Sequence, residues 1–243
     1  MRVLALDTTT REGSLALVEG SRVIVERSGD PSRTHAERLP RDIQLLLEKR
    51  GLASSDVDVF AVAAGPGSFT GLRIGIATIQ GLSFVHGRRV AVVPALEAMA
   101  QIAGRAVSGG ALVGAWMDAG RGEVYSALYR LSAHPPFDSR RLIETDAPAV
   151  GGPATTLSRW RDLVGEAAVA FVGSGAVTYA DLISARDREA RIFSPTALAG
   201  AVGLLAVSRA ALGETVEPAS VRPLYVRRPD AELDRDRRTE RKR

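Results

Sequence analysis

The segment Gly65–Gly75, with the sequence GPGSFTGLRIG, constrains the fold of this chain more than any other segment. It follows the apolar run Val59–Ala64, which is typical of a buried β-strand. It also opens a segment, residues 70–85, whose pattern predicts a helix. A glycine-rich turn between a strand and a helix can present backbone N–H groups to an anion. The segment therefore predicts a strand, a tight turn and a helix, with the turn as a candidate anion site.

The predicted helix at residues 70–85 is apolar on almost every side. Two neighbouring stripes of small or apolar residues run along it: Gly71, Gly75, Thr78 and Leu82 in one, and Leu72, Ile76, Ile79 and Ser83 in the other. A helix of this kind must be covered on more than one side. We expect its own sheet to cover one side and a partner helix, brought close by Gly71 and Gly75, to cover the other.

Length and composition narrow the class of protein. A chain of 243 residues is long enough for one large domain or two small ones. It contains no cysteine, which excludes disulfides, zinc–thiolate sites and a thiol nucleophile. The start of the chain reaches Asp7 too soon for a signal peptide, and no run of about 18 apolar residues follows. We therefore expect a soluble, cytoplasmic protein without a membrane span.

The charge is concentrated at the end of the chain. Residues 227–243 hold eight Arg/Lys and five Asp/Glu, so they account for +3 of the formal net charge of +4. We expect a charged, disordered tail here, with nonspecific contacts to nucleic-acid phosphates as the alternative. Only Lys49 and Lys242 are lysines, and neither lies in a GxxxxGKS/T motif, which excludes a P-loop.

Two segments of the chain, Leu4–Val18 and Gly114–Tyr129, resemble each other. Each reads as an apolar strand that ends in Asp, a short polar turn and a second strand. The two copies predict two lobes with the same hairpin core, residues 1–104 and 105–226. Residues 104–110 are rich in glycine and form the candidate hinge.

Within the first lobe, Thr34 and Glu37 form a capping box that predicts the start of a helix. Pro40 should kink this helix because it removes one backbone hydrogen bond, and Gly51 should end it. The apolar face of the helix consists of Ala36, Leu39, Ile43, Leu46 and Leu47. Three strands followed by helix-linked strands predict an α/β lobe, a mixed sheet with helices on its faces.

The second lobe gives a weaker pattern. Residues 167–172 predict a strand that leads into the turn Gly173–Ala176. Pro195 is placed to begin a helix that runs through Leu212. Residues 132–165 contain turn signals and no motif that we can interpret.

Four motifs resemble those of the TsaB (YeaZ) family of the glycoprotease-like superfamily: Asp7–Thr9, His35–Pro40, Gly65–Gly75 and Asp118–Tyr125. The resemblance implies an actin-like ATPase (ASKHA) fold of two ribonuclease-H-like lobes with mixed five-stranded sheets. It implies a noncatalytic dimerisation subunit of the bacterial machinery that makes threonylcarbamoyladenosine in tRNA. The implied partners are a catalytic paralogue, TsaD, and an ATPase, TsaE, with tRNA reached indirectly through the complex.

The sequence departs from the catalytic paralogue at its metal site. Where that paralogue has an HxxxH pair, this chain has Ala95 and Met99, which cannot bind a divalent metal. Its histidines, at positions 35, 86 and 134, have no HxxxH spacing. We therefore expect neither a metal nor another cofactor. A second departure lies in the turn after Asp118, where this chain has Gly120 and the family often has Arg. This difference changes the flexibility of the turn and hardly affects the resemblance.

Three loops resemble nucleotide-binding or anion-binding loops of the superfamily, and we treat them as candidate vestigial sites. They consist of Asp7, Thr8 and Thr9, of Gly65, Gly67 and Ser68, and of Gly173, Ser174 and Gly175. The structural alternatives are a capped hairpin turn, close packing and a plain strand-to-helix turn, respectively. His35 could be a base or a polar residue in a first helical turn. Asp118 and Glu123 could be a catalytic carboxylate pair or part of a structural ion pair with Arg121.

The two first-lobe helices, residues 34–50 and 70–86, are the predicted partner surface, in a four-helix arrangement with the equivalent pair of another subunit. The predicted contact residues are Leu39, Ile43, Leu46, Leu47, Gly71, Leu72, Gly75, Thr78, Ile79 and Leu82, although some of the four on the first helix must face its own sheet. The same surface predicts a homodimer when the partner is absent. The rival hypothesis is a self-sufficient actin-like nucleotide hydrolase or small-molecule kinase. A metalloprotease is disfavoured because the histidine pair is missing.

Overall fold

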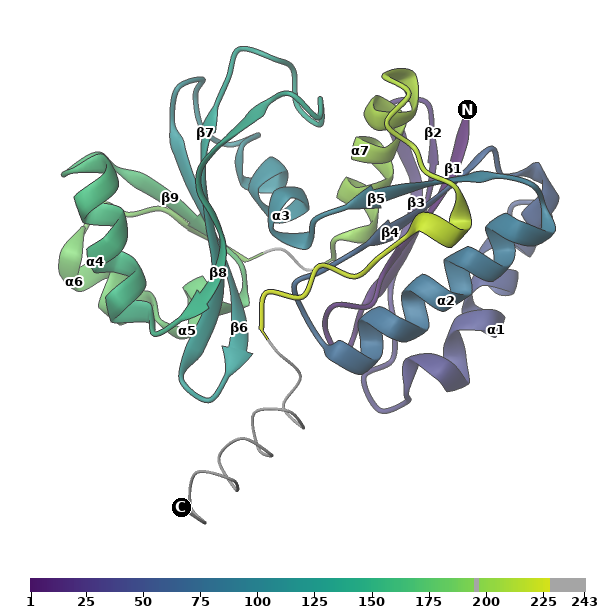
Figure 1. The fold of residues 1–243 in the computed structure, drawn as a ribbon, viewed down its shortest axis with the longest axis horizontal. Coiled ribbons are helices and arrows are strands. Elements are labelled where there is room, and N and C mark those ends of the chain that lie inside the picture. Colours follow the sequence, from purple (N-terminus) through teal and green to yellow (C-terminus); the bar gives the residue numbers. More distant parts are fainter. Residues whose placement is uncertain (195–196, 228–243) are drawn as a thin grey trace.

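The computed structural model describes residues 1–194 and 197–227 and contains two five-stranded sheets. The first has the order β3-β2-β1-β4-β5 (Figure 1). β1 pairs antiparallel with β2 and parallel with β4, so this sheet is mixed. Its strands are β1 (Arg2–Asp7), β2 (Ser14–Glu19), β3 (Arg22–Ser28), β4 (Val59–Ala63) and β5 (Arg89–Val93).

The second sheet repeats this arrangement with the order β10-β9-β6-β7-β8. β6 pairs antiparallel with β7 and parallel with β9, as β1 does with β2 and β4. Its strands are β6 (Leu112–Gly120), β7 (Glu123–Leu131), β8 (Leu142–Gly151), β9 (Val169–Val172) and β10 (Ile192–Phe193). The expected fold class, α/β with two mixed five-stranded sheets, is confirmed.

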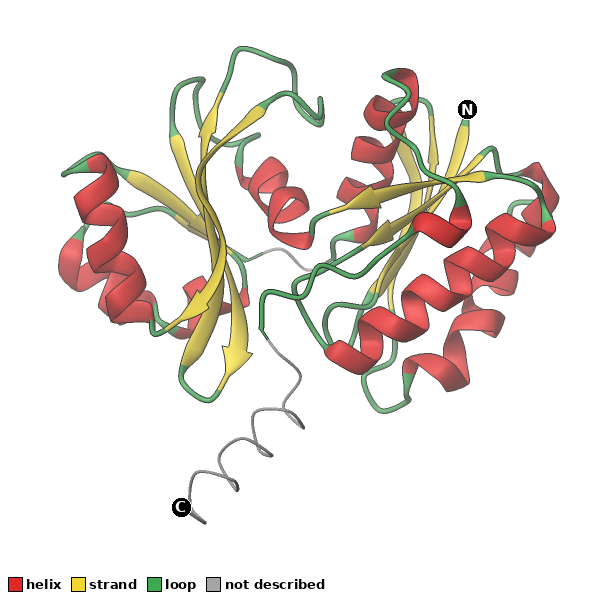
Figure 2. Ribbon diagram, viewed as in Figure 1, coloured by secondary structure: helices red, strands yellow, loops and turns green. Residues whose placement is uncertain are grey.

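Helices flank both sheets (Figure 2). They are α1 (His35–Glu48), α2 (Phe69–Val85), α3 (Ala95–Ala103), α4 (Pro153–Val164), α5 (Ser174–Thr178), α6 (Ala180–Arg186) and α7 (Ala199–Ala211), with 3-10 turns η1 (Ser54–Asp56) and η2 (Pro218–Ser220). The predicted capping box is present, since Thr34 Oγ1 accepts from the Glu37 amide and Glu37 accepts from the Thr34 amide at 2.7 Å. None of the described helices is long and apolar enough to cross a membrane.

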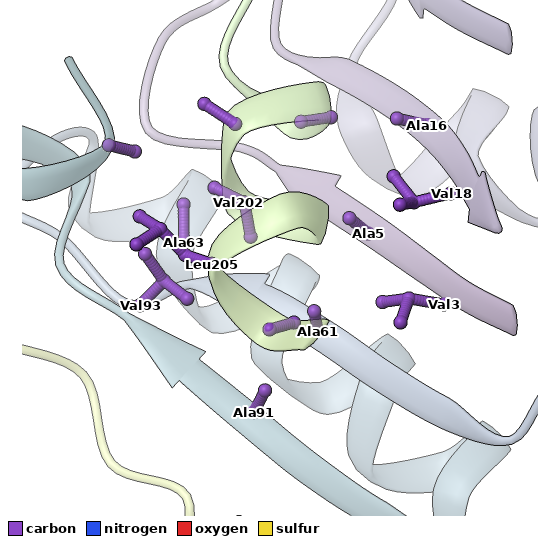
Figure 3. Close-up of a cluster of buried hydrophobic side chains, with 14 of the residues drawn as sticks. Val3, Ala5, Ala16, Val18, Ala61, Ala63, Ala91, Val93, Val202 and Leu205 are labelled. Carbon is purple, nitrogen blue, oxygen red and sulfur yellow. The ribbon is translucent and has the colours of Figure 1, made fainter. Parts of the chain in front are cut away.

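Helices α3 and α7 do not follow the expected boundary between residues 104 and 105. Helix α7 packs against the first sheet, and α3 packs against the second. Figure 3 shows Val202 and Leu205 of α7 over Val3, Ala5 and Ala61 of the first sheet. Each sheet has two apolar faces, and α1 and α2 cover only one face of the first, so its other face is buried by a helix from late in the chain.

The start of α7 also differs from the prediction. The helix begins at Ala199 and ends at Ala211, and Leu198 precedes it as the N-cap. Its first turn is capped by the first sheet: Ser14 Oγ accepts from the Leu198 and Ala199 amides, and Glu26 accepts from the Gly200 amide at 2.6 Å. The expected initiator, Pro195, lies outside the described residues, as do residues 228–243 of the predicted tail.

Candidate partner surface and interlobe cleft

The four leucine and isoleucine residues of α1 that we expected at the partner surface lie in the core. Leu39 is 1% exposed, and the others are also buried. They form one apolar cluster with Leu4 of β1 and Phe60 of β4. The expectation was therefore wrong in orientation: the apolar face of α1, Leu39, Ile43, Leu46 and Leu47, covers its own sheet.

The small residues of α2 face inward as well. A Cβ atom added to Gly71 would overlap the carbonyl of Thr8, and one added to Gly75 would overlap the Thr8 hydroxyl. Leu72 and Ile79 are fully buried. The glycines thus allow the chain's own β1–β2 hairpin to approach α2, and they do not receive a partner helix. Of the predicted α2 contacts, Thr78 and Leu82 are half-buried and reach the surface.

A different face of α2 is exposed and apolar. Ala77, Gly81 and Val85 are spaced by four residues and lie on one face of the helix, and Phe84 is next to them. Phe84 is 82% exposed and Val85 is 75% exposed. A Cβ atom on Gly81 would have no described atom within 4 Å. Exposed apolar residues that gather in one place are typical of interaction surfaces. We call Ala77, Gly81, Phe84 and Val85 the outer face of α2.

A cleft of about 1010 Å³ lies between the two lobes. The first lobe contributes the loop after β1 and the first turns of α1 and α2, and the second contributes the end of β6 and the start of α5. The candidate loops converge here, since Thr9, Gly67, Ser68 and Ser174 all line the cleft. The structure therefore brings together residues from the three loops that the sequence singled out.

The first of these loops, Asp7–Thr9, is turned into the protein. Asp7 is 3% exposed, and its Oδ1 accepts from the Thr9 amide at 2.9 Å and from the Thr9 hydroxyl at 2.6 Å. Burial raises the pKa of the Asp7 carboxyl above its ordinary value, while the bonds from Thr9 act in the opposite direction. Thr8 is fully buried. This geometry is that of a capped hairpin turn.

The second loop packs closely against the first. The Ser68 amide donates to the Thr9 carbonyl at 2.7 Å, and a Cβ atom on Gly67 would overlap the same carbonyl. The Ser68 side chain caps α2 by accepting from the Gly71 amide at 3.2 Å. Gly67 is required because the two backbones touch, and Ser68 because the helix needs an acceptor at its N-terminus. A Cβ atom on Gly65 would likewise overlap a backbone carbonyl, that of Leu224.

The third loop, Gly173–Gly175, packs closely against residues of α3 and β6. A Cβ atom on Gly173 would overlap the methyl group of Met99. Ser174 Oγ accepts from the Asp118 amide at 3.1 Å. Met99 and Ala95, the positions where the resemblance to the paralogue led us to look for a histidine pair, are buried in the apolar core of the second lobe. Among residues 1–194 and 197–227, no group of three or more His, Asp or Glu is placed to hold a metal ion.

His35 is held in a structural network. Its Nε2 bonds to the Thr10 carbonyl at 2.9 Å, and Arg38 donates to its Nδ1 at 2.9 Å. The pKa of the His35 imidazole is lowered below its ordinary value, and burial of the ring is the largest cause. Because both ring nitrogens are engaged, the imidazole positions the loop after β1, and the geometry favours a structural role for His35.

The carboxylates of Asp118 and Glu123 each have a different structural partner. Asp118 Oδ1 accepts from the Gly120 amide at 2.9 Å within the β6–β7 turn. Glu123 forms an ion pair with Arg227, a residue that we expected in the charged tail. A contact between residues 104 positions apart leaves no local signal in the sequence, so this pair could not be predicted.

A second ion pair that the sequence did not indicate joins α3 to α7. Arg209 Nη2 donates to Glu97 Oε2 at 2.7 Å, and Arg209 Nη1 donates to the Val92 carbonyl at 2.8 Å. Both side chains are largely buried. Burial raises the pKa of Glu97 above its ordinary value, although Arg209 lowers it. The pair is therefore a buried, charged contact between the helices that cover the two sheets.

Known proteins resemble this chain both in sequence and in structure. A family model described as TsaD, tRNA N6-adenosine threonylcarbamoyltransferase, matches residues 29–135. The tRNA threonylcarbamoyladenosine biosynthesis protein TsaB of Escherichia coli is 34% identical over 230 residues, which cover 93% of this chain and 95% of that protein. YeaZ from Pseudomonas aeruginosa has a solved structure with 32% identity and a TM-score of 0.73, covering 92% of this chain and 99% of that chain.

A more distant structure shares the fold alone. The activator of 2-hydroxyisocaproyl-CoA dehydratase from Clostridium difficile, solved with ADPNP, is 12% identical with a TM-score of 0.50 and covers 88% of this chain and 97% of that chain. The similarity to TsaB, in contrast, extends over most of both chains. The chain has the two-lobed actin-like ATPase fold and belongs to the TsaB (YeaZ) family of tRNA threonylcarbamoyladenosine biosynthesis proteins.

Proposed function

We propose that this chain is a noncatalytic scaffold subunit in the biosynthesis of threonylcarbamoyladenosine in tRNA. It binds and activates a TsaD-like catalytic paralogue, helps to recruit a TsaE-like ATPase, and reaches tRNA indirectly through that complex in the cytoplasm. The names of the TsaB relatives and the TsaD family match support the process and the partner. The observation that carries the scaffold role is the exposed apolar outer face of α2.

The cleft supports a noncatalytic role. The residues that resemble phosphate-binding loops bond to one another: Asp7 caps Thr9, and Ser68 caps α2. Phosphoryl transfer needs cations around the phosphates, usually metal ions held by carboxylates. Asp7 is buried with a raised pKa, which disfavours the charged carboxylate that such a metal needs. The loops therefore serve as packing elements that keep the shape of the fold.

The outer face of α2 is the docking surface in this proposal. Small residues at Ala77 and Gly81 let a second helix approach closely, and the apolar side chains of Phe84 and Val85 supply area to bury. The half-buried Thr78 and Leu82 lie at its border. The pair α1 and α2 meets the equivalent pair of the paralogue in a four-helix arrangement. A second copy of this chain offers the same face, so a homodimer forms when the paralogue is absent.

Gly81→Arg should weaken binding of the TsaD-like paralogue. An added side chain at a close helix contact costs about 1–3 kcal/mol, which corresponds to about fivefold to 150-fold in affinity. Glycine is a poor helix former, so the variant helix should fold at least as well as the original. Isothermal titration calorimetry with the purified paralogue measures the affinity, and circular dichroism measures the fold.

Gly109→Arg is the matched control. Gly109 is also exposed and has no described atom closer than 4.0 Å to an added Cβ atom, but it lies in the connection between α3 and β6. We expect its affinity to equal that of the unchanged protein. If a folded Gly81→Arg variant binds as tightly as Gly109→Arg, the docking surface lies elsewhere.

ATP turnover separates this proposal from a self-sufficient nucleotide hydrolase. We expect the isolated chain, incubated with ATP and magnesium, to release no more phosphate than a heat-denatured sample. Release at about 1 per second or faster, a typical enzymatic rate, would show that the enzyme hypothesis is correct. The same assay with the TsaD-like and TsaE-like proteins present shows whether turnover depends on the complex.

A further inference from the structure

The last described segment of the chain, Val221–Arg227, crosses from the first lobe to the second along the interlobe cleft. Figure 1 shows it running from η2, beside α2, toward β6. Leu224, Tyr225 and Arg227 line the cleft together with residues of both lobes. We call Val221–Arg227 the strap.

The strap begins firmly attached to the first lobe. Val221 is 2% exposed and belongs to the apolar cluster under α1 and α2. The Leu224 amide donates to the Ala64 carbonyl at 2.7 Å, directly after β4. These contacts fix the backbone of the strap at the end of the first sheet.

The middle of the strap lies on the first turn of α2. The ring of Tyr225 stacks on Phe69, with centroids 5.0 Å apart and an interplanar angle of 26°. Arg73 donates to the Tyr225 hydroxyl at 3.2 Å, and its guanidinium lies 4.1 Å from the centroid of the Phe69 ring. The stacked rings and the Arg73 guanidinium form one compact contact. This contact holds the middle of the strap against α2, from where the chain continues to the second lobe.

The end of the strap is bound by the β6–β7 hairpin of the second lobe. Arg227 Nη1 donates to the Ala119 carbonyl at 2.8 Å, and Nη2 forms an ion pair with Glu123. The guanidinium also lies 5.5 Å from the centroid of the Tyr125 ring. The Arg227 side chain is 13% exposed and that of Glu123 is 39% exposed, so the arginine end of these charge-assisted bonds is largely shielded from water.

We propose that the strap is a clasp that fixes the angle between the two lobes and therefore the width of the cleft. The lobes also touch through α3 and α7, where Glu97 pairs with Arg209. Contacts between lobes of one chain permit relative motion unless they are extensive. Helices α3 and α7 act as the hinge, and Arg227 closes the cleft at a separate place. Loss of the Arg227 contacts frees the second lobe to rotate about that hinge.

Spin labels across the cleft test the clasp in the full-length chain. Because the chain has no cysteine, Lys49→Cys on the first lobe and Asp162→Cys on the second provide the only two labelling sites. Both positions are exposed. Pulsed electron–electron double resonance then reports the distribution of distances between the lobes. We expect one narrow distribution in the parent and a broad one, shifted to other distances, in Arg227→Ala.

Two further variants make the result decisive. Arg222→Ala removes an arginine of the same strap that bonds only to the neighbouring Ala219 and Val221 carbonyls among the described residues, so its distribution should stay narrow. Glu123→Gln weakens the clasp from the other lobe and should broaden the distribution, even if Arg227→Ala does not fold. Narrow distributions in every folded clasp variant would overturn the proposal.

Discussion

Truncating Leu39 to alanine is expected to lower the free energy of unfolding by about 2–5 kcal/mol, the usual cost of removing a buried leucine side chain. Leu39 is 1% exposed and packs in the core under α1. Urea unfolding followed by circular dichroism gives the free energy from the transition midpoint and slope. A large loss of stability would place this side chain in the fold of the first lobe rather than at its partner surface.

Leu45→Ala is the matched control for this prediction. Leu45 lies on the same helix and is 38% exposed. We expect its truncation to change the free energy of unfolding by about 0.5 kcal/mol or less, as at most surface sites. If Leu39→Ala kept full stability and lost affinity for the TsaD-like paralogue, the orientation of α1 described above would be wrong.

Arg209→Ala is expected to lower the free energy of unfolding by about 3–5 kcal/mol, because it leaves the buried Glu97 carboxylate without its partner. The other contact that it removes is the hydrogen bond to the Val92 carbonyl. Urea unfolding of the two single variants and of the double variant Arg209→Ala/Glu97→Gln separates the cost of the unpaired Glu97 carboxylate from that of the lost hydrogen bond. The double variant should recover part of the loss, since a neutral amide costs less to bury than a charge.

The pH dependence of Arg209→Ala gives an independent check. Burial raises the pKa of Glu97 in the folded state, and loss of Arg209 removes an interaction that lowers it. A carboxyl whose folded pKa exceeds its unfolded pKa favours folding below the unfolded value, and this contribution is lost as the pH rises through the folded pKa. The deficit of Arg209→Ala relative to the unchanged protein should therefore shrink at acidic pH. A deficit that does not vary with pH would assign the loss to packing instead.

Local signals explain what could be predicted along the chain. The capping box of Thr34 and Glu37 marked the start of α1, and the apolar run before Gly65 marked β4. The hairpin motif repeated after Leu4 and Gly114 indicated two similar sheets, and both have the same strand order. Each of these features depends on residues close together in the chain, within one helical turn, one strand or one hairpin, so the sequence alone contains it.

The orientation of the glycine stripe needed the tertiary structure. Gly71 and Gly75 indicate that another segment approaches α2 closely, and this inference holds. Periodicity cannot say which segment approaches, and the segment is the chain's own Thr8 loop. Once the glycines and leucines face inward, Ala77, Gly81 and Phe84 remain outside, although they form a less regular pattern in the sequence.

Sequence motifs alone indicated the family, the elements of the first lobe and the lack of an HxxxH pair, whereas β8 and α4, within residues 132–165, gave no pattern that we could interpret. The tertiary structure decided how distant segments combine. It placed α7 on the first sheet, joined Glu97 to Arg209 and tied Arg227 to the second lobe. The physical reason is that secondary structure follows from neighbouring residues, whereas burial of both faces of a sheet and pairing of charges depend on which distant surfaces meet.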